Sequence, residues 1–312
     1  MTACGGQGMV KVTPGMGRGA VAAARPAEAP AQPVKAALWM LGAIASFTLM
    51  AVAGRAVQVE LTSFQLMFWR SLIGFAVVFA LVMASRPGLS QVRTSQPGLH
   101  LTRNVFHFAG QNLWFFGIMA IPLSQLVALE FTMPLWVVLL APLVLGERLT
   151  WRKIGLAGLG FVGVLIVAQP GLQPVAAGHL AGLLAAVGFA MNLMLTKMLM
   201  RHDSVLCVLF WMTVSQTAFG LALSFIGGFT WPSTALIPWL AVVGLTGLSA
   251  HFSLTTALSL APASVVAPME FARLPIIALV GVALYAEALD PFVFLGAALI
   301  FGANWLNLRT PR

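Results

Sequence analysis

The sequence predicts an all-α integral membrane protein with ten transmembrane helices arranged as two inverted five-helix repeats. The first observation is the composition: apolar residues make up 60% of the 312 residues, whereas charged residues make up 8%. A soluble domain carries about 25% charged residues, so the composition excludes a soluble protein. The other two observations are the spacing of the apolar segments and an internal repeat, which are taken in turn below.

Residues 1–35 differ from the rest of the chain. They are rich in Gly, Ala and Pro, and their basic residues are Lys11, Arg18, Arg25 and Lys35. They contain no apolar run long enough for the core of a signal peptide. We therefore predict that residues 1–35 form a disordered cytoplasmic tail.

Pro, Gly and charge clusters divide the remaining chain into ten apolar segments of about the length that crosses a bilayer, about 17–25 residues. The short connections between them predict that consecutive helices are antiparallel neighbours. The predicted spans are 36–55, 64–84, 101–120, 123–145, 153–168, 178–200, 205–227, 235–260, 263–286 and 291–308.

The positions of the basic residues predict the orientation. Of the 17 Lys and Arg residues, all but Arg55, Arg70 and Arg273 lie in the tail or in connections that share its side of the membrane. The opposite connections near 169–178, 228–235 and 286–291 carry none. Lys and Arg favour cytoplasmic loops, so we expect a multi-pass protein of the bacterial inner membrane with both termini in the cytoplasm.

Several functional classes find no support in the sequence. The net charge of +9 is not gathered into a basic, aromatic patch of the kind that binds nucleic acid. Cys4 and Cys207 form neither a disulfide framework nor a metal-binding spacing. ATP-binding, HExxH and G-x-S-x-G motifs are missing, so we predict no cofactor, no metal and no enzymatic activity. A channel and an intramembrane enzyme remain the alternatives from other classes.

An internal repeat relates the two halves of the chain at an offset of 140 residues, where 121–149 align with 261–289 without a gap. Thr150 and Asp290 then align as helix N-caps, with Pro291 at the first helical position. The matching polar and proline pairs are Pro122/Pro262, Ser124/Ser264, Glu130/Glu270 and Glu147/Glu287. Two coincident Glu pairs among eight acidic residues indicate a genuine duplication.

The duplication predicts two domains, residues 36–170 and residues 178–308, with five spans each. Because five is odd, the second domain is inverted relative to the first. Inverted repeats are typical of secondary transporters, which bind substrate between the halves near the membrane midplane. Glycines in the fifth and tenth spans, including Gly155, Gly163 and Gly296, predict close helix packing there.

The pattern Pro-x-Ser-x-x-x-x-x-Glu-Phe that closes on Gly/Ala-Glu-x-Leu occurs at 122–149 and again at 262–289. It resembles the duplicated EamA domain of the drug/metabolite transporter superfamily, as do Phe68-Trp69-Arg70 and Arg103-Asn104. The resemblance covers residues 36–308. It implies a central cavity lined by spans 1–4 and 6–9, and transport driven by a gradient. The second half departs from the pattern, because Met212 stands where Arg70 would be matched.

Six ionisable residues lie within the predicted spans, where a charge costs about 2.5–3.5 kcal/mol on insertion scales. Depth along the helices predicts that Arg70 pairs with Glu130, directly or through a bridging water or substrate, and that Glu270 pairs with Arg273 one turn further on. A buried structural ion pair is the alternative for each. His107 and His251 are candidate proton carriers, or are simply hydrogen-bonded to neighbours. We interpret Glu147 and Glu287 as structural.

Neutral and proline residues complete the candidate site. The neutral candidates for substrate contact are Asn112, Trp114, Asn192, Phe131 and Phe271. Proline weakens a helix locally, and the candidate hinges beside the two carboxylates are Pro134, Pro142, Pro268 and Pro275. Kinks without a role in motion are the alternative.

These residues predict a secondary transporter that moves a small organic metabolite across the inner membrane by alternating access. An amino acid, an amphiphilic metabolite or a cationic drug fits an apolar cavity with both charge signs, and we expect export. Uptake of a vitamin or nucleoside-like metabolite is the alternative. The expected partners are the substrate and the lipid bilayer; proton coupling and the oligomeric state stay open.

Overall fold

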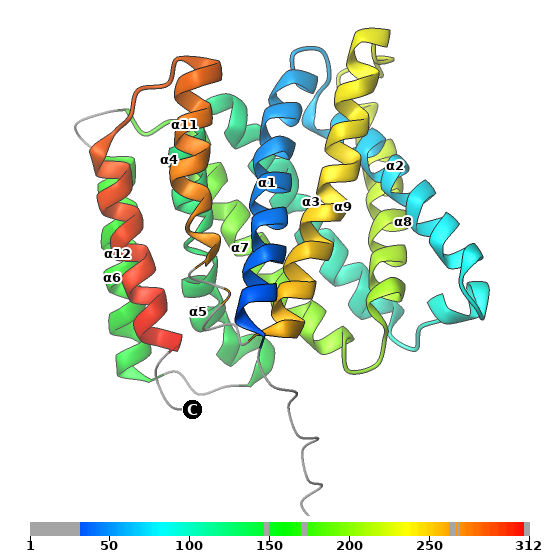
Figure 1. Cartoon of the computed structure of the whole chain (residues 1–312), viewed down its shortest axis with the longest axis horizontal. Helices are drawn as coiled ribbons and strands as arrows, with labels where there is room; N and C mark the ends of the chain where they lie inside the picture. The colour runs from blue at the N-terminus through cyan, green and yellow to red at the C-terminus, as the bar shows by residue number, and fades with distance from the viewer. Residues whose placement is uncertain (1–31, 147–149, 170–173, 262–265, 267–268, 309–312) are drawn as a thin grey trace, which may run out of the picture. The chain divides into compact units, whose positions relative to one another are not determined.

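A computed structural model describes residues 32–146, 150–169, 174–261, 266 and 269–308. These residues are helical or irregular and contain no strand, which confirms the predicted all-α class. Gln32–Arg312 form one compact unit. The helices, shown in Figure 1, are α1 (Pro33–Val57), α2 (Ser63–Ala84), η1 (Gly88–Val92), α3 (Pro97–Ala120), α4 (Leu123–Glu130), α5 (Met133–Leu145), α6 (Trp151–Ala168), α7 (Ala177–Leu199), α8 (Val205–Ser224), η2 (Thr234–Leu236), α9 (Ile237–Leu260), α11 (Arg273–Tyr285) and α12 (Pro291–Leu308).

The helices fall on the predicted apolar segments. Within the described residues, seven helical stretches are long and apolar enough to cross a membrane, and two further apolar helices, Arg273–Tyr285 and Pro291–Asn307, are shorter. The chain is therefore a multi-pass integral membrane protein. Helix α3 is 24 residues long but too polar to be counted, because His100, Arg103, Asn104 and His107 lie on its buried surface. The predicted tail, residues 1–35, lies outside the described residues up to position 31.

Two predicted helix starts are confirmed in atomic detail. The Thr150 hydroxyl accepts a hydrogen bond from the Lys153 amide at 3.3 Å and begins α6. The Asp290 carboxylate accepts one from the Phe292 amide at 2.9 Å and begins α12. Its other oxygen accepts a hydrogen bond from Gln169 at 2.6 Å. Asp290 thus connects the end of α6 to the start of α12.

The predicted span 123–145 is one membrane-spanning stretch, Leu123–Leu145, but a turn at Phe131 and Thr132 divides it into α4 and α5. Helix α4 ends at Glu130, and α5 begins at Met133 with Pro134 in its first turn. Proline lacks an amide hydrogen and clashes with the carbonyl four residues earlier, here that of Glu130. The second segment has the same turn after Glu270, before α11 begins at Arg273.

The helices associate mainly in four pairs: α1 with α9, α3 with α7, α2 with α8, and α6 with α12. Glycines allow the closest approaches. A Cβ atom on Gly163 would lie 2.6 Å from the Gly296 carbonyl oxygen, and one on Gly296 would lie 2.5 Å from the Gly163 carbonyl oxygen. The predicted close packing of the fifth and tenth spans is therefore confirmed at this crossing. Gly155, in contrast, has open space around its Cα.

We expect Gly163→Leu to separate α6 from α12, because the new side chain would overlap the backbone of α12. Overpacking of this kind lowers stability by about 1–3 kcal/mol or more. The matched control is Gly155→Leu on the same helix, which should leave stability unchanged. The measurement is the thermal unfolding midpoint of each purified variant in detergent. Equal midpoints for the two variants would contradict the observed crossing.

Candidate functional site

A carboxylate cluster, made up of Glu130, Glu270 and Arg273, lies where the two broken segments meet. Glu130, the last residue of α4, accepts a hydrogen bond at 2.9 Å from the indole of Trp114 on α3. Its other oxygen lies 2.7 Å from Nη2 of Arg273, the first residue of α11. The Arg273 side chain is 2% exposed and the Glu130 side chain 16% exposed. The ion pair therefore joins the first half of the chain to the second inside the protein.

Both predicted charge pairs are wrong. Glu130 pairs with Arg273 instead of Arg70, and Arg273 reaches across to α4 instead of back to Glu270. The turn after Glu270 explains the second error, because residues three apart share a helix face only where the helix is continuous. Glu270 still interacts electrostatically with both Arg273 and Glu130.

Aromatic rings surround the Arg273 guanidinium. Its Cζ atom lies 5.0 Å from the ring centroid of Phe47 on α1 and 5.4 Å from that of Phe131. Phe131 also packs against Phe271, with 4.3 Å between ring centroids. Phe131 and Phe271 are related by the 140-residue offset, so the two copies of one position meet here. An apolar pocket of about 220 Å³ is lined by Phe271 together with Phe294 and Phe301 of α12.

A second group of side chains, the cationic cluster, lies between α2, α3 and α9. Its members are Arg70, Arg103, His107 and His251. Arg70, Arg103 and His107 are at most 6% exposed, and the two imidazole rings meet edge to face with 5.6 Å between centroids. Gln216 of α8 hydrogen-bonds to Nδ1 of His107 at 2.8 Å. The structure thus brings the two histidine candidates and Arg70 together.

The remaining predicted residues are dispersed. Asn112 donates a hydrogen bond to the carbonyl of Phe108, while its own buried side-chain oxygen has no partner among the described residues. The Asn192 side-chain oxygen is likewise buried and has no hydrogen-bond partner among the described residues. Pro142 lies inside α5 and Pro275 in the first turns of α11. Pro268 and Glu147 lie outside the described residues.

Three functional candidates were missed from the sequence. Arg103 lies near the predicted end of a span, where a basic residue usually faces the interface, and Gln216 and Phe47 are neutral. Gln216 is a polar residue in the middle of an apolar run, and that signal could have identified it. Phe47 packs against both Arg273 and His251, a contact that apolar composition alone does not reveal.

Glu287 has the structural role that the sequence predicted. Its carboxylate lies 2.6 Å from Nη1 of Arg55 and accepts a hydrogen bond from the Leu123 amide at 2.9 Å. Arg55 in turn donates to the carbonyls of Ile118 and Ile121. The contact joins the end of α1, the start of α4 and the segment after α11.

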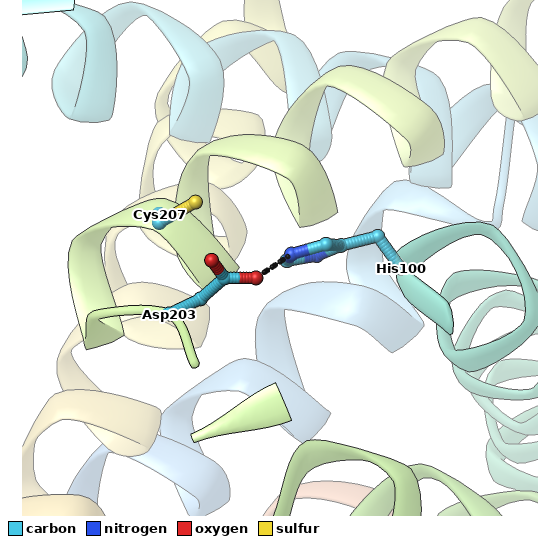
Figure 2. A group of neighbouring side chains, drawn as sticks. All are labelled: His100, Asp203 and Cys207. Carbon is cyan, nitrogen blue, oxygen red and sulfur yellow. Dashed lines mark hydrogen bonds and ion pairs between the residues drawn. The ribbon is translucent and has the colours of Figure 1, made fainter. Parts of the chain in front are cut away.

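Figure 2 shows a further group, His100, Asp203 and Cys207, whose potential metal-binding atoms all lie within 4.8 Å of one another. Nε2 of His100 lies 2.8 Å from the Asp203 carboxylate, which also accepts a hydrogen bond from Thr94 at 2.7 Å. These contacts connect the start of α3 to the segment between α7 and α8. The three residue types suit a transition metal ion, but the contacts already present give the group a structural role without one.

Comparisons with known proteins identify relatives along the whole membrane domain. The EamA-like transporter family matches twice, at residues 34–169 and 176–309. A riboflavin transporter of Rhizobium johnstonii is 32% identical over 90% of this chain and 93% of its own length. An S-adenosylmethionine uptake transporter of Rickettsia prowazekii is 26% identical over 85% of this chain and 90% of its own. One solved crystal structure, 20% identical, has the same fold with a TM-score of 0.62 over 88% of this chain and 98% of that chain.

We expect Glu130→Leu to destabilise the protein by up to about 3–5 kcal/mol, because it leaves the buried Arg273 charge without its partner. The double variant Glu130→Leu/Arg273→Met removes both charges and should recover most of that loss. Denaturant unfolding in detergent measures both effects. If the single variant is as stable as the unmodified protein, the ion pair does not hold the halves together.

Proposed function

Because this chain belongs to the EamA-like transporter family of membrane transporters, we propose that it takes up a nucleoside-like or vitamin-like heteroaromatic metabolite, with riboflavin as the first candidate. The observation that carries the proposal is the 32% identity with a riboflavin transporter over 90% of this chain. A second riboflavin transporter, from Brucella anthropi, is also 32% identical over 78% of this chain. Riboflavin and S-adenosylmethionine both combine a nitrogen heterocycle with a polyhydroxylated part.

The direction of transport in this proposal is inward. Export was the first expectation from the sequence, and uptake of a vitamin or nucleoside-like metabolite was the alternative. A relative named as an uptake transporter, similar over most of the chain, favours the alternative. The inner membrane and cytoplasmic termini belong to the proposal too, supported by the distribution of Lys and Arg.

The proposed architecture is ten spans in two inverted repeats, residues 36–170 and 178–308, that alternate access to a site between them. The helix pairing supports it. If each span is replaced by the span five places along, the α1–α9 contact (spans 1 and 8) becomes the α7–α3 contact (spans 6 and 3), and the reverse. The contacts α2–α8 (spans 2 and 7) and α6–α12 (spans 5 and 10) are each converted into themselves. A two-fold relation between the halves requires such a pattern. The repeated turn after Glu130 and Glu270 supports it as well.

In this mechanism the turns after Glu130 and Glu270 are the hinges, with Pro134 and Pro275 beside them. The heterocycle of the substrate stacks against aromatic side chains around the carboxylate cluster, such as Phe131 and Phe271, because offset aromatic rings attract one another. Nε of Arg273 is buried without a hydrogen-bond partner in the described part of the chain. It is therefore ready to donate a hydrogen bond to a substrate or a water.

The proposed activity is tested with purified protein in liposomes. We expect labelled riboflavin outside to exchange for unlabelled riboflavin inside, because counterflow needs no coupling ion. S-adenosylmethionine is tested in parallel, and liposomes without protein are the control. Absence of counterflow with both compounds, from folded protein, would reject this substrate class.

We expect Glu130→Gln and Glu270→Gln to separate binding from energy coupling, because each removes a buried group that can carry a proton. Counterflow should persist, whereas accumulation driven by an imposed pH gradient should fall about tenfold or more. Glu60→Gln, which changes an exposed acid hydrogen-bonded to Ser233, is the matched control. Accumulation that follows the pH gradient in both variants as in the unmodified protein would show that the carboxylates do not couple protons.

A further inference from the structure

The cationic cluster contains two buried arginines, Arg70 and Arg103, that form no ion pair with an acidic side chain among the described residues. In that part of the chain, the Met67 sulfur at 3.5 Å is the hydrogen-bond partner of Nη1 of Arg70. Arg103 donates to the Thr196 hydroxyl at 3.0 Å and to the Asn104 side-chain oxygen at 2.9 Å, which are neutral acceptors. Within the described residues neither guanidinium forms an ion pair, although both side chains are at most 6% exposed.

Each acidic residue that the structure describes interacts with a group other than Arg70 or Arg103. Glu130 pairs with Arg273, Asp203 with His100 and Glu287 with Arg55. Asp290 begins α12 and Glu60 hydrogen-bonds to Ser233. Glu270 belongs to the carboxylate cluster through its interaction with Arg273. The guanidinium groups of Arg70 and Arg103 therefore have no acidic partner in the part of the chain that the structure describes.

The four side chains of the cationic cluster lie at successive depths along the helix bundle. Arg70 lies about 10 Å along α2 from its start, and Arg103 about 9 Å along α3 from its start, at 1.5 Å per residue. Since α2 and α3 are consecutive and antiparallel, these depths are measured from opposite ends of the bundle. His107, one turn beyond Arg103 on α3, and His251 on α9 interact electrostatically with both arginines. The sequence Arg70, His251, His107, Arg103 thus extends between the outer and inner thirds of the bundle.

Helix α9 has a glycine, Gly247, at the point where it packs against the Arg70 side chain. A Cβ atom on Gly247 of α9 would lie 2.7 Å from Nη2 and 2.8 Å from Nε of Arg70. Gly247 therefore provides the space that the guanidinium occupies. A small cavity beside it is lined by Arg70, Ser71, Gln216 and Gly247 and has room of about 10 Å³ for a water-sized sphere, enough for about one water molecule.

The charged residues of the cationic cluster have no charged counterparts at the equivalent positions of the other repeat. At the 140-residue offset that relates α3 to α9, Arg103 corresponds to Val243 and His107 to Gly247. Arg70 corresponds to Met212 on α8. The duplication of the fold therefore does not account for these charges, and their placement calls for a separate explanation.

We propose that the cationic cluster is the subsite for a negatively charged group on the transported metabolite. A guanidinium fork matches a carboxylate or phosphate in two parallel hydrogen bonds. A buried charge is stable only when it is paired or hydrogen-bonded, and the anionic group of the substrate supplies the missing partner. This inference rests on the proposed transport function and narrows its substrate class to metabolites with an anionic group. Of the two proposed compounds it favours S-adenosylmethionine, which has a carboxylate, over riboflavin, which is uncharged at neutral pH. The cavity lies between α2 of the first half and α8 and α9 of the second.

The test uses benzoate, a small aromatic carboxylate, and benzamide, its neutral counterpart of nearly equal shape. The measurement is the thermal unfolding midpoint and the intrinsic tryptophan fluorescence of the purified full chain, at constant sodium concentration. We expect benzoate to raise the midpoint and to bind saturably, and benzamide to do neither. Arg70→Gln and Arg103→Gln should each weaken benzoate binding about tenfold or more.

Two further variants keep the test decisive. Arg70→Lys retains the charge without the fork and should bind benzoate with intermediate strength, which covers the case in which the Gln variant does not fold. Arg86→Gln removes an exposed cation and should bind as the unmodified protein does. Equal effects of benzoate and benzamide, or unchanged benzoate binding in Arg70→Gln and Arg103→Gln, would overturn the proposal.

The outcome is separable from that of the transport assay. Benzoate binding that depends on Arg70, without counterflow of riboflavin or S-adenosylmethionine, would support the anion subsite and reject the proposed substrates. Counterflow of riboflavin without any selective benzoate binding would support the transport function and reject the anion subsite.

Discussion

The contact between Glu130 and Arg273 is the interaction on which the interior of this protein depends. Neither charge is stable in hydrocarbon alone, and each stands at the end of a helix that is broken next to it. The pair holds the end of α4 against the start of α11, so the two broken segments come together at one place. Trp114, Phe47 and Phe131 then complete the surroundings of the two charged groups. A site at a helix break also has the freedom to move that an unbroken helix lacks.

The two clusters have different electrostatic character. The carboxylate cluster contains groups of both signs, whereas the two arginines of the cationic cluster have only neutral hydrogen-bond acceptors among the described residues. Phe47 contacts both, because its ring centroid lies 5.0 Å from the Arg273 Cζ atom and 5.8 Å from the His251 ring centroid. Displacement of either cluster would therefore alter the packing of the other.

The structure combines symmetric and asymmetric features, and the difference is informative. The repeated turn, the Phe131–Phe271 contact and the pairing of the helices follow the internal duplication. The arginines and histidines of the cationic cluster do not. The symmetric features concern backbone geometry and packing, which the duplication of the chain repeats. The asymmetric features concern charge, which the duplication does not repeat.

The sequence by itself determined the all-α membrane class, the approximate bounds of most helices, the helix starts at Thr150 and Asp290, and several of the buried ionisable residues, but not Arg103. These follow from local rules: hydrocarbon solvation, capping and the periodic placement of basic loops. Only the tertiary structure decided which charges meet. Depth along a helix placed Arg70 level with Glu130, but a side chain also needs the right rotation about the helix axis and the right neighbour. The turn after Glu270 changed that rotation for Arg273, and Gly247 made room for Arg70 on α9 instead, so the partners could be identified only once the helices were packed.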